Sequence, residues 1–515
     1  MGKLNPIFKS AFYDNIINSM TANTSRYYAF ASNPIEITGN TPAVSADDYS
    51  TNFSPDWKMI FGKKLTTNDI IPVIEKNIWT SNTVYDRYDN TSTSLYNNNN
   101  YYVVSEPSTP GGSYIIYVCI DNNNGESSTV DPSSFGTPTQ ATTFQTSDNY
   151  KWRYVSTISN SNYLKFSTTD YIPVYTNSTL SSTSESRAGV EVVVVSNSGT
   201  GYDNYHEGTV LSVTNSTLVQ ISSNASSTSF YYNNNAIYFN TGSEATSQLL
   251  KVSNYIHNSG GNWVYLDSES NTNNITPSIT QYKIVPNLIF TSDGNTAPVG
   301  YCTVNNISNS ISSVVILDNG SYVTWANVQV SSIYGSGANL YCIVPPPGGF
   351  GHTPASELNM KGIAFAFSFA NNESNTILTS NVVYNQIGLI ENPYSLGANN
   401  TKGAYFNSNT FSQTTKANVS PSYTFSYGET IVGANSGSRA TVIFSNSSVV
   451  YFVGDKNFID GEYIANTSNV NVTTISITNS ASLYAKDVKP LYIQNINNVN
   501  RSNTQTESFK IIIQV

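Results

Sequence analysis

Charged side chains are scarce in this chain of 515 residues. They make up 11% of the sequence, against about 25% in an ordinary soluble protein. The basic residues number 23, they are scattered along the chain, and the formal net charge is −10. A nucleic-acid-binding surface shows clustered Lys and Arg. The composition therefore argues against a nucleic-acid partner.

Long apolar runs and cysteines are also few. No apolar run approaches the roughly 20 residues needed to cross a bilayer, and Lys3 is not followed by the apolar stretch of a signal peptide. We therefore expect a soluble protein made in a cytoplasm, with no membrane partner. Cys119, Cys302 and Cys342 are an odd number without short spacing, which predicts buried thiols in a reducing compartment.

Motifs for catalysis and metal binding are missing from the sequence. It contains neither a Gly-x-Ser-x-Gly elbow nor a phosphate-binding Gly-Lys-Ser/Thr loop. Zinc sites need three or four ligands with local spacing, whereas the chain has only three histidines. We interpret His206, which has acidic neighbours, as a solvated loop residue. The sequence thus predicts no enzyme, no cofactor and no metal, although an acidic pair for glycoside hydrolysis cannot be recognised from sequence.

The segment 121–126 imitates the start of a calcium-binding loop. Its sequence is Asp-Asn-Asn-Asn-Gly-Glu, but Gly125 stands one position too early for the calcium-loop pattern and no Glu occupies the twelfth position. An Asn/Gly turn between two strands explains the segment more simply.

Uncharged polar residues and aromatic residues are abundant in place of charged ones. Aromatics reach 12% of the sequence, with 37 Tyr, and a disordered chain would have few of them. Asn favours turns, whereas Tyr and Val favour strands. Short runs of Val, Ile, Tyr and Phe bounded by Gly, Asn, Ser or Pro are typical of sandwiches and barrels. We predict a mainly β, multi-domain protein of sandwich-like modules with few helices.

One clear helical pattern lies near the N-terminus, over residues 5–20. Asn5 can cap the helix, Pro6 suits its first turn, and apolar residues from Ile7 to Met20 recur near 3.6-residue spacing. A second short helix is expected over residues 55–61.

Two pairs of similar segments indicate small β modules inserted into a larger frame. Segments 192–202 and 314–322 each read as a strand, a Gly-bearing turn that needs positive φ, and a tyrosine that can pack back on the strand. Segments 427–431 and 460–464 share a Gly-Glu step. Two copies of each pattern are fewer than a solenoid needs.

Ser/Thr-rich stretches at 177–187 and 395–420 predict the junctions between these parts. We expect a discontinuous core domain that carries two insertions. The predicted parts are 1–184 (core), 185–340 (inserted β domain), 341–396 (core), 397–480 (second inserted β module) and 481–515 (C-terminal strands of the core).

The stretch 345–352, Pro-Pro-Pro-Gly-Gly-Phe-Gly-His, is the most distinctive loop. Its prolines fix an extended backbone and its glycines allow a tight return. Such a loop is pre-organised, so that docking it costs little ordering entropy. Both a rigid interdomain elbow and an assembly contact fit this pattern.

Five groups of residues, spread over the chain, carry a resemblance to a known family. The groups are 79–89; 117–125 with 148–154 and 164–174; 345–352 with 357–358; 387–393; and 491–495 with 501–507 and 510–513.

In this order the groups resemble the baseplate wedge protein of T-even-like contractile-tailed bacteriophages, in the longer version of marine relatives. The family usually has His where Phe350 stands. The resemblance implies a structural virion protein of the tail baseplate, assembled in the host cytoplasm, that catalyses nothing. It also implies a homodimer within each wedge and other wedge proteins as partners.

Residues expected to matter for folding or assembly follow from these motifs. They are Trp79, Tyr85, Trp152, Tyr154 and Phe166 as core or interface anchors, Pro346 and Gly348 on the Pro-Gly loop, and Arg501 and Glu507 as polar contacts beside the last strand.

Two other classes of protein share this composition. A receptor-binding fibre or adhesin would be equally rich in β-structure, Tyr, Asn and Ser, but should trimerise and show longer repeats. A glycan-degrading tailspike would need an acidic pair in a groove. Both alternatives stay open at the level of the sequence.

Overall fold

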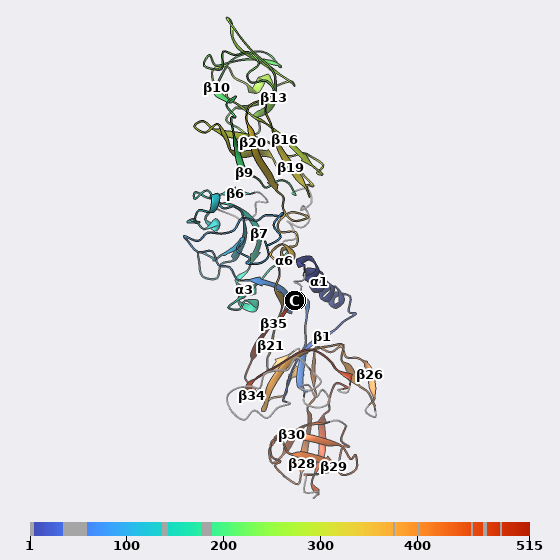
Figure 1. Ribbon diagram of the computed structural model, residues 1–515. Helices are drawn as coiled ribbons and strands as arrows, with labels where there is room; N and C mark the ends of the chain where they lie inside the picture. The colour runs from blue at the N-terminus through green and yellow to red at the C-terminus, as the bar shows by residue number, and fades with distance from the viewer. Residues whose placement is uncertain are drawn as a thin grey trace. The chain divides into compact units, whose positions relative to one another are not determined.

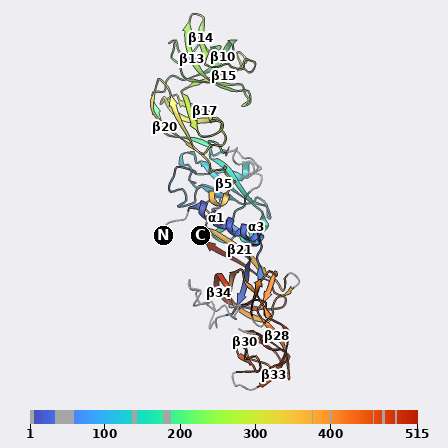
Figure 2. The same ribbon diagram turned by 90° about the vertical axis from the view of Figure 1, so that its right-hand side faces the viewer.

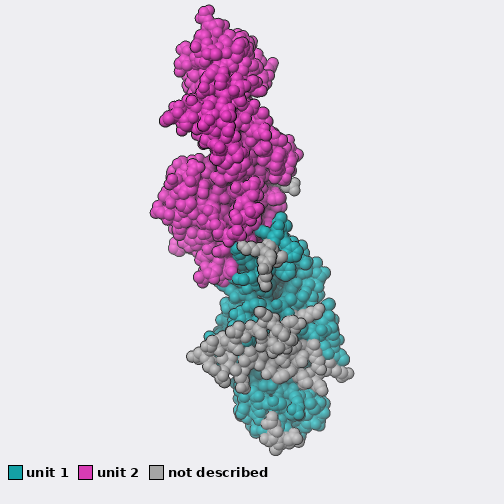
Figure 3. Space-filling view, in the orientation of Figure 1, with its two compact units in different colours: residues 1–73, 361–515 teal, residues 74–360 magenta. Residues whose placement is uncertain are grey.

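A computed structural model describes residues 5–33, 59–135, 143–176, 188–373, 376–398, 401–454, 457–466, 471–484 and 487–515. The described chain is mainly β, with one longer helix at the N-terminus and a few short ones, as predicted (Figure 1). The chain packs into two compact units: unit 1 holds residues 1–73 and 361–515, and unit 2 holds residues 74–360 (Figure 3). The finer domain boundaries expected from the sequence stay predictions.

The N-terminal helix of unit 1 is α1 (Pro6–Thr21), and it begins as the sequence predicts. The Asn5 side chain accepts a hydrogen bond from the backbone N–H of Ile7 (2.9 Å), and Pro6 occupies the first turn. The apolar residues that give the helical spacing are nevertheless exposed: Phe8 by 62% and Phe12 by 48%. The expected second helix over 55–61 is wrong for Met59–Phe61, which form a strand; residues 55–58 lie outside the described part.

The main sheet of unit 1 has five antiparallel strands in the order β27-β2-β1-β24-β34. Its central strand β1 is buried along its whole length, with Tyr28 and Phe30 in the core. A sheet buried on both faces needs such a continuous apolar strand. The bounds are β1 (Tyr27–Ser32), β2 (Met59–Lys64), β24 (Val382–Glu391), β27 (Thr410–Ser412) and β34 (Lys489–Arg501).

A second sheet of unit 1 places β21 between β3 and β35. Short elements accompany the two sheets. Their bounds are η1 (Thr67–Asp69), β3 (Ile70–Glu75), β21 (Gly362–Phe369), β22 (Asn372–Glu373), β23 (Thr376–Ile377), β25 (Tyr394–Leu396), β26 (Lys402–Tyr405) and β35 (Glu507–Gln514).

A closed barrel with strand order β28-β31-β30-β29-β32-β33 completes unit 1 (Figure 2). Phe452, Ile431 and Val442 lie in its core. The Gly-Glu steps of the sequence fall at its turns, where the buried Glu462 carboxylate accepts hydrogen bonds from the N–H groups of Asn435 and Ser436 (both 2.9 Å). The bounds are β28 (Thr415–Ser420), β29 (Thr430–Gly433), β30 (Arg439–Ser445), β31 (Val449–Gly454), β32 (Tyr463–Ala465) and β33 (Asn471–Asn479).

Unit 2 contains a four-stranded sheet in the order β4-β5-β7-β6. The Asn/Gly turn follows β5: Asn123, Asn124 and Gly125 all have positive φ, as the turn interpretation of that segment requires. The bounds are β4 (Tyr102–Ser105), β5 (Tyr114–Asp121), η2 (Asn123–Gly125), η3 (Pro132–Phe135), β6 (Phe144–Gln145), β7 (Lys151–Ile158), α3 (Asn160–Phe166), β8 (Tyr171–Pro173) and α6 (Pro354–Glu357).

Three antiparallel strand pairs of unit 2 enclose one core in a sandwich-like module. The pairs are β9 with β20, β17 with β18 and β16 with β19, and each contributes residues to the same apolar cluster, among them Cys342, Val314 and Val328. The bounds are β9 (Val192–Thr200), β16 (Asn287–Ser292), β17 (Val299–Asn305), β18 (Ser310–Asp318), β19 (Ala326–Ser331) and β20 (Ser336–Ile343).

A second closed barrel lies in residues 206–285, with strand order β10-β11-β14-β13-β12-β15. His206 opens β10 instead of lying in a solvated loop, so that interpretation was wrong. Its ring stacks on Tyr282 (5.7 Å between centroids) and its Nδ1 lies 2.8 Å from the Tyr282 hydroxyl. The bounds are β10 (His206–Asn215), β11 (Leu218–Ile221), β12 (Ala236–Asn240), β13 (Gln248–Asn258), β14 (Gly261–Leu266), η4 (Thr272–Asn274) and β15 (Gln281–Val285).

The two similar segments of the sandwich-like module differ in their tyrosines. Gly199, Gly201 and Gly320 have the predicted positive φ. Tyr202 packs back into the core and is 3% exposed, whereas Tyr322 is 43% exposed. The prediction that both rings pack on their strands is therefore right for Tyr202 and wrong for Tyr322.

Candidate functional site

An aromatic cluster in unit 2 brings together most of the expected anchors. Trp152 on β7 is fully buried, and the Tyr85 ring meets it edge-on at 5.8 Å, while Tyr150 stacks on it at 5.5 Å. Strand pairing places Trp152 opposite Cys119 on β5. These contacts belong to the core of the sheet, because neither Tyr85 nor Trp152 reaches the surface.

The other expected anchors lie around this cluster or away from it. Tyr154 is 4% exposed and belongs to the cluster, and the half-buried Trp79 packs against it while its indole N–H donates to Ser128 Oγ (3.2 Å). Phe166 is buried at the end of α3 and is not a member of the cluster. The structure thus gives Tyr154 and Phe166 core positions.

The Pro-Gly loop, residues 345–352, is held by a buried carboxylate. Glu357 is 2% exposed; its Oε2 accepts from the N–H of Gly351 (2.7 Å) and its Oε1 from the N–H of Thr353 (2.6 Å). Gly348 has a φ of +86°, and a Cβ there would lie 2.5 Å from the His352 ring. The loop therefore needs glycine at this position and a carboxylate beneath it.

Aromatic residues of segment 86–101 support the loop from inside unit 2. Phe350 is 1% exposed and its ring meets Tyr88 edge-on at 5.0 Å. The Tyr101 hydroxyl donates to the Glu357 carbonyl oxygen (2.8 Å), and burial raises the pKa of Tyr101 well above its usual value. Pro346 and Gly348 are half-buried, and Pro347 is exposed. Only a short, rigid tip of the loop is thus open to a partner.

A polar hollow of about 350 Å³ lies on the same segment. Its charged groups are engaged: Asn98 donates to Asp86 Oδ2 (2.7 Å), and Arg87 Nη2 donates to the Tyr341 hydroxyl (2.9 Å). Most of these polar groups are thus engaged within the chain, while Arg87 Nε is buried without a hydrogen-bond partner. The hollow is lined by Asp86, Arg87, Asp89, Ser92, Ser94, Leu95, Asn98 and Asn122.

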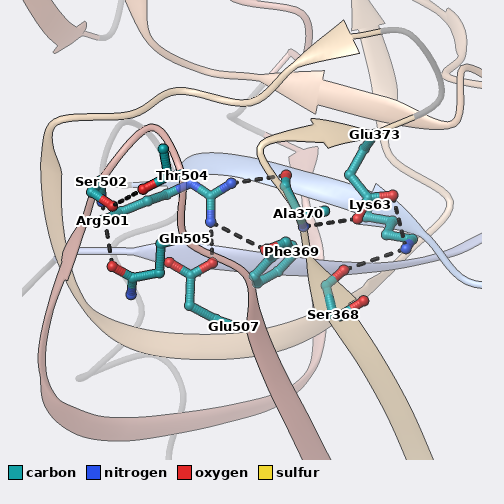
Figure 4. A network of polar contacts seen from close by, with 10 residues as sticks. All are labelled: Lys63, Ser368, Phe369, Ala370, Glu373, Arg501, Ser502, Thr504, Gln505 and Glu507. Atoms are coloured by element: carbon teal, nitrogen blue, oxygen red, sulfur yellow. Dashed lines mark hydrogen bonds and ion pairs between the residues drawn. The ribbon is translucent and has the colours of Figure 1, made fainter.

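Arg501 and Glu507 form a buried ion pair in unit 1 (Figure 4). The Arg501 guanidinium also donates to the carbonyl oxygens of Phe369 (3.3 Å) and Ala370 (2.9 Å) and lies over the Phe61 ring at 5.0 Å. These bonds tie the turn between β34 and β35 to the end of β21. The pair is an internal brace, since Arg501 is 1% exposed.

The buried carboxylates of Glu357 and Glu191 were not among the site residues predicted from the sequence. Glu357 was noted only as part of the segment 357–358. Its position six residues after Gly351 is nevertheless a signal, because a carboxylate there can accept hydrogen bonds from the loop. Glu191 pairs with Arg153 at 3.2 Å; the two residues are both buried, and no local spacing links them, so the sequence carried no signal for this pair.

The cysteines are free and buried, as predicted. Burial raises the pKa of Cys302 and of Cys342 to about 12. Thiols of this kind stay neutral and act as small apolar side chains.

The described residues hold no group of three or more His, Cys, Asp or Glu residues that could bind a metal ion. No helix among them has the length and apolar character needed to span a membrane. Comparison with known proteins adds no relative: neither a protein-family model nor a curated protein matches this sequence.

Proposed function

We propose that this protein is a structural component of the baseplate wedge of a contractile phage tail. In this role it braces neighbouring wedge subunits during assembly and contraction and carries out no catalysis. Its partners are other wedge proteins and a second copy of itself, and it resides in the tail baseplate of the virion after assembly in the host cytoplasm.

One observation carries the proposal: motif segments that are far apart in the sequence lie on paired strands. Gly388 and Ile493, which belong to different motif groups, lie opposite each other in the main sheet of unit 1. Cys119 and Trp152, from two segments of one group, lie opposite each other in unit 2. The two closed barrels, by contrast, consist of residues between the motif groups. Segments 117–125, 148–154, 387–393 and 491–495 thus lie largely on paired strands outside the barrels, whereas 79–89 and 345–352 lie mainly outside strands. This arrangement supports one inherited frame with added modules.

The physical chemistry of the Pro-Gly loop also supports a bracing role. Proline, glycine and a buried carboxylate already hold this loop in one conformation. It therefore loses little conformational entropy when a partner docks on it. Sparse charge lowers the desolvation cost of burying a wide surface, and aromatic residues are the usual anchors of permanent interfaces.

The test is complex formation by the intact chain. We would purify the full-length protein, measure its mass by native mass spectrometry, and then mix it with the products of neighbouring tail genes. The proposal predicts a dimer and a complex of fixed stoichiometry with at least one neighbour. A chain that stays monomeric beside every neighbour contradicts it.

A matched pair of variants separates the loop from the general surface. Pro347→Glu places a charge on the exposed tip of the Pro-Gly loop, where burial in an interface would be costly, and we expect complex formation to weaken at least tenfold. Ile307→Glu places the same charge on a side chain that is 92% exposed in the turn between β17 and β18, and it should leave the complex intact.

A further inference from the structure

The segment between β18 and β19 presents two aromatic side chains to solvent. Tyr322 is 43% exposed and Trp325 is 55% exposed. Between them Val323 is fully buried in the core of the sandwich-like module. The segment is therefore anchored by one apolar side chain, while two large rings that burial would stabilise remain outside. Both rings are therefore available for contact with a ligand.

The backbone at Tyr322 is strained. Its φ is +57°, in the left-handed region that a bulky side chain adopts at a cost. Most other non-glycine residues with positive φ in the described chain are Asn, which tolerates that region. Burial of the Tyr322 ring does not offset this strain, because the ring is largely exposed. The ring of Tyr202, at the equivalent place in the other segment, is buried. Backbone strain that side-chain packing does not offset is typical of functional sites.

Hydrogen bonds hold the segment in this conformation from both sides. Asp293 Oδ1 accepts from the backbone N–H groups of Thr324 and Trp325 (both 2.9 Å), and Oδ2 accepts from the Thr324 hydroxyl. These bonds lower the pKa of Asp293 to about 2.

On the other side, the Asn295 N–H donates to the Ser321 carbonyl (2.9 Å), and the Val323 N–H donates to the Ala188 carbonyl (2.8 Å). The two rings are thus carried by a backbone that is fixed before any ligand arrives.

The surroundings of the rings are polar. Asn295, Thr296 and Thr324 are exposed and offer amide and hydroxyl groups. In segments 291–298 and 319–327 the one charged residue is Asp293, whose oxygens already accept hydrogen bonds from the segment. The two segments themselves contribute no Lys or Arg to a phosphate, a sulfate or an anionic lipid. This surface suits a ligand with both apolar C–H faces and hydroxyl groups.

We propose that Tyr322 and Trp325 form a binding platform for a neutral hexose glycan. The face of an aromatic ring is electron-rich and attracts the weakly positive C–H groups on one face of a sugar ring. The Asn295 amide can donate hydrogen bonds to the sugar hydroxyls and accept them, and the hydroxyl oxygens of Thr296 and Thr324 can accept them. The platform adds recognition of a polysaccharide surface to the bracing role and does not depend on it.

Affinity electrophoresis of the full-length chain tests the platform. Native gels would contain the neutral polymers dextran, mannan or soluble starch, with hyaluronate as an anionic comparison. We expect retardation in at least one neutral gel and none in hyaluronate. Trp325→Ala and Tyr322→Gly should each reduce the apparent affinity at least tenfold. Ile307→Ser, which removes an even more exposed apolar side chain elsewhere in the module, should migrate like the unchanged protein.

Thermal unfolding of Tyr322→Gly supplies a second readout. Glycine adopts positive φ without strain, so this variant should lose glycan binding while its melting temperature stays equal or rises. A merely structural tyrosine would instead lower the melting temperature. Unretarded migration in all three neutral gels overturns the proposal. So does loss of complex formation with tail proteins in Trp325→Ala without any glycan retardation, because the rings would then be a protein contact.

Discussion

At the scale of single residues, the clearest contrast is between aromatic rings that are buried and rings that are held outside. Trp152 lies at the centre of its cluster with Tyr85 edge-on and Tyr150 stacked, and its indole N–H makes no hydrogen bond within the described chain. Its contribution to folding is therefore packing alone.

We predict that Trp152→Ala lowers the free energy of unfolding by about 3–5 kcal/mol, as truncation of a large buried ring does. Urea titration monitored by far-ultraviolet circular dichroism measures it. Trp325→Ala, which truncates an exposed indole, should stay within about 0.5 kcal/mol of the unchanged protein. An equal effect of the two substitutions would show that Trp152 is not a core residue.

Phe230 offers a second test of backbone strain, independent of Tyr322. It has a φ of +69° and is 59% exposed on the barrel of residues 206–285. Phe230→Asn should raise the free energy of unfolding by about 1 kcal/mol, because Asn tolerates the left-handed region. Asn234→Ala, at a φ of +67°, should lower it by a similar amount. Thermal melts measure both changes. A higher melting temperature in Phe230→Asn and a lower one in Asn234→Ala support this explanation, and a lower melting temperature in Phe230→Asn contradicts it.

At the scale of elements, the Pro-Gly loop depends on one carboxylate. Glu357→Gln replaces an acceptor oxygen with an amide N–H facing the donors of Gly351 or Thr353. Leaving a buried donor without a partner costs about 1–3 kcal/mol, and we expect that loss together with faster proteolysis near residue 350. Glu269→Gln, an exposed counterpart, should change neither property. Equal protease sensitivity of the unchanged protein and both variants would show that Glu357 does not hold the loop in its conformation.

Local signals in the sequence predicted those elements whose stability is local. The cap at Asn5 and the Pro at position 6 fixed the start of α1, and the Asn/Gly composition of 121–126 predicted its turn. Residues 59–61 were misassigned because a helical spacing of apolar residues over so short a span also fits a fully buried strand. The equivalent tyrosines Tyr202 and Tyr322 diverged because tertiary packing, which no local pattern encodes, decides whether a ring is covered.

The candidate sites show the same division. The loop glycines could be identified from residue type and spacing, and Tyr85 and Trp152 from the segments that carry the resemblance. Contacts across long sequence separations, such as Arg153 with Glu191, could not. Arg501 and Glu507 were named from the C-terminal segment that carries the resemblance, as polar contacts beside the last strand, and the structure pairs them with each other.

At the scale of the whole molecule, the abundance of buried tyrosine makes stability depend on alkaline pH. Burial raises the pKa of Tyr150 and of Tyr231 from 10.0 to about 12. The raised pKa in the folded state means that the folded protein holds its protons more tightly than the unfolded chain. Stability from these groups is therefore complete below about pH 10 and is lost as the pH rises through about 12.

We expect the melting temperature to stay level from pH 7 to about pH 9.5 and then to fall steeply, with phenolate absorbance appearing together with unfolding. Scanning calorimetry and absorbance at 295 nm, recorded on the same samples, measure this. Full ionisation of the tyrosines near pH 10 without any loss of structure would contradict the burial on which this prediction depends.

We propose that the sheets whose strands carry the motif segments, together with the Pro-Gly loop of unit 2, bind neighbouring tail proteins. Hydrogen–deuterium exchange of the full chain, alone and after mixing with those proteins, tests it most directly. We predict slower exchange in peptides covering 345–360 and 86–101 in the mixture, with little change in the barrel of residues 415–479. Unchanged exchange throughout these sheets and the loop, or protection confined to the barrels, would contradict the proposal.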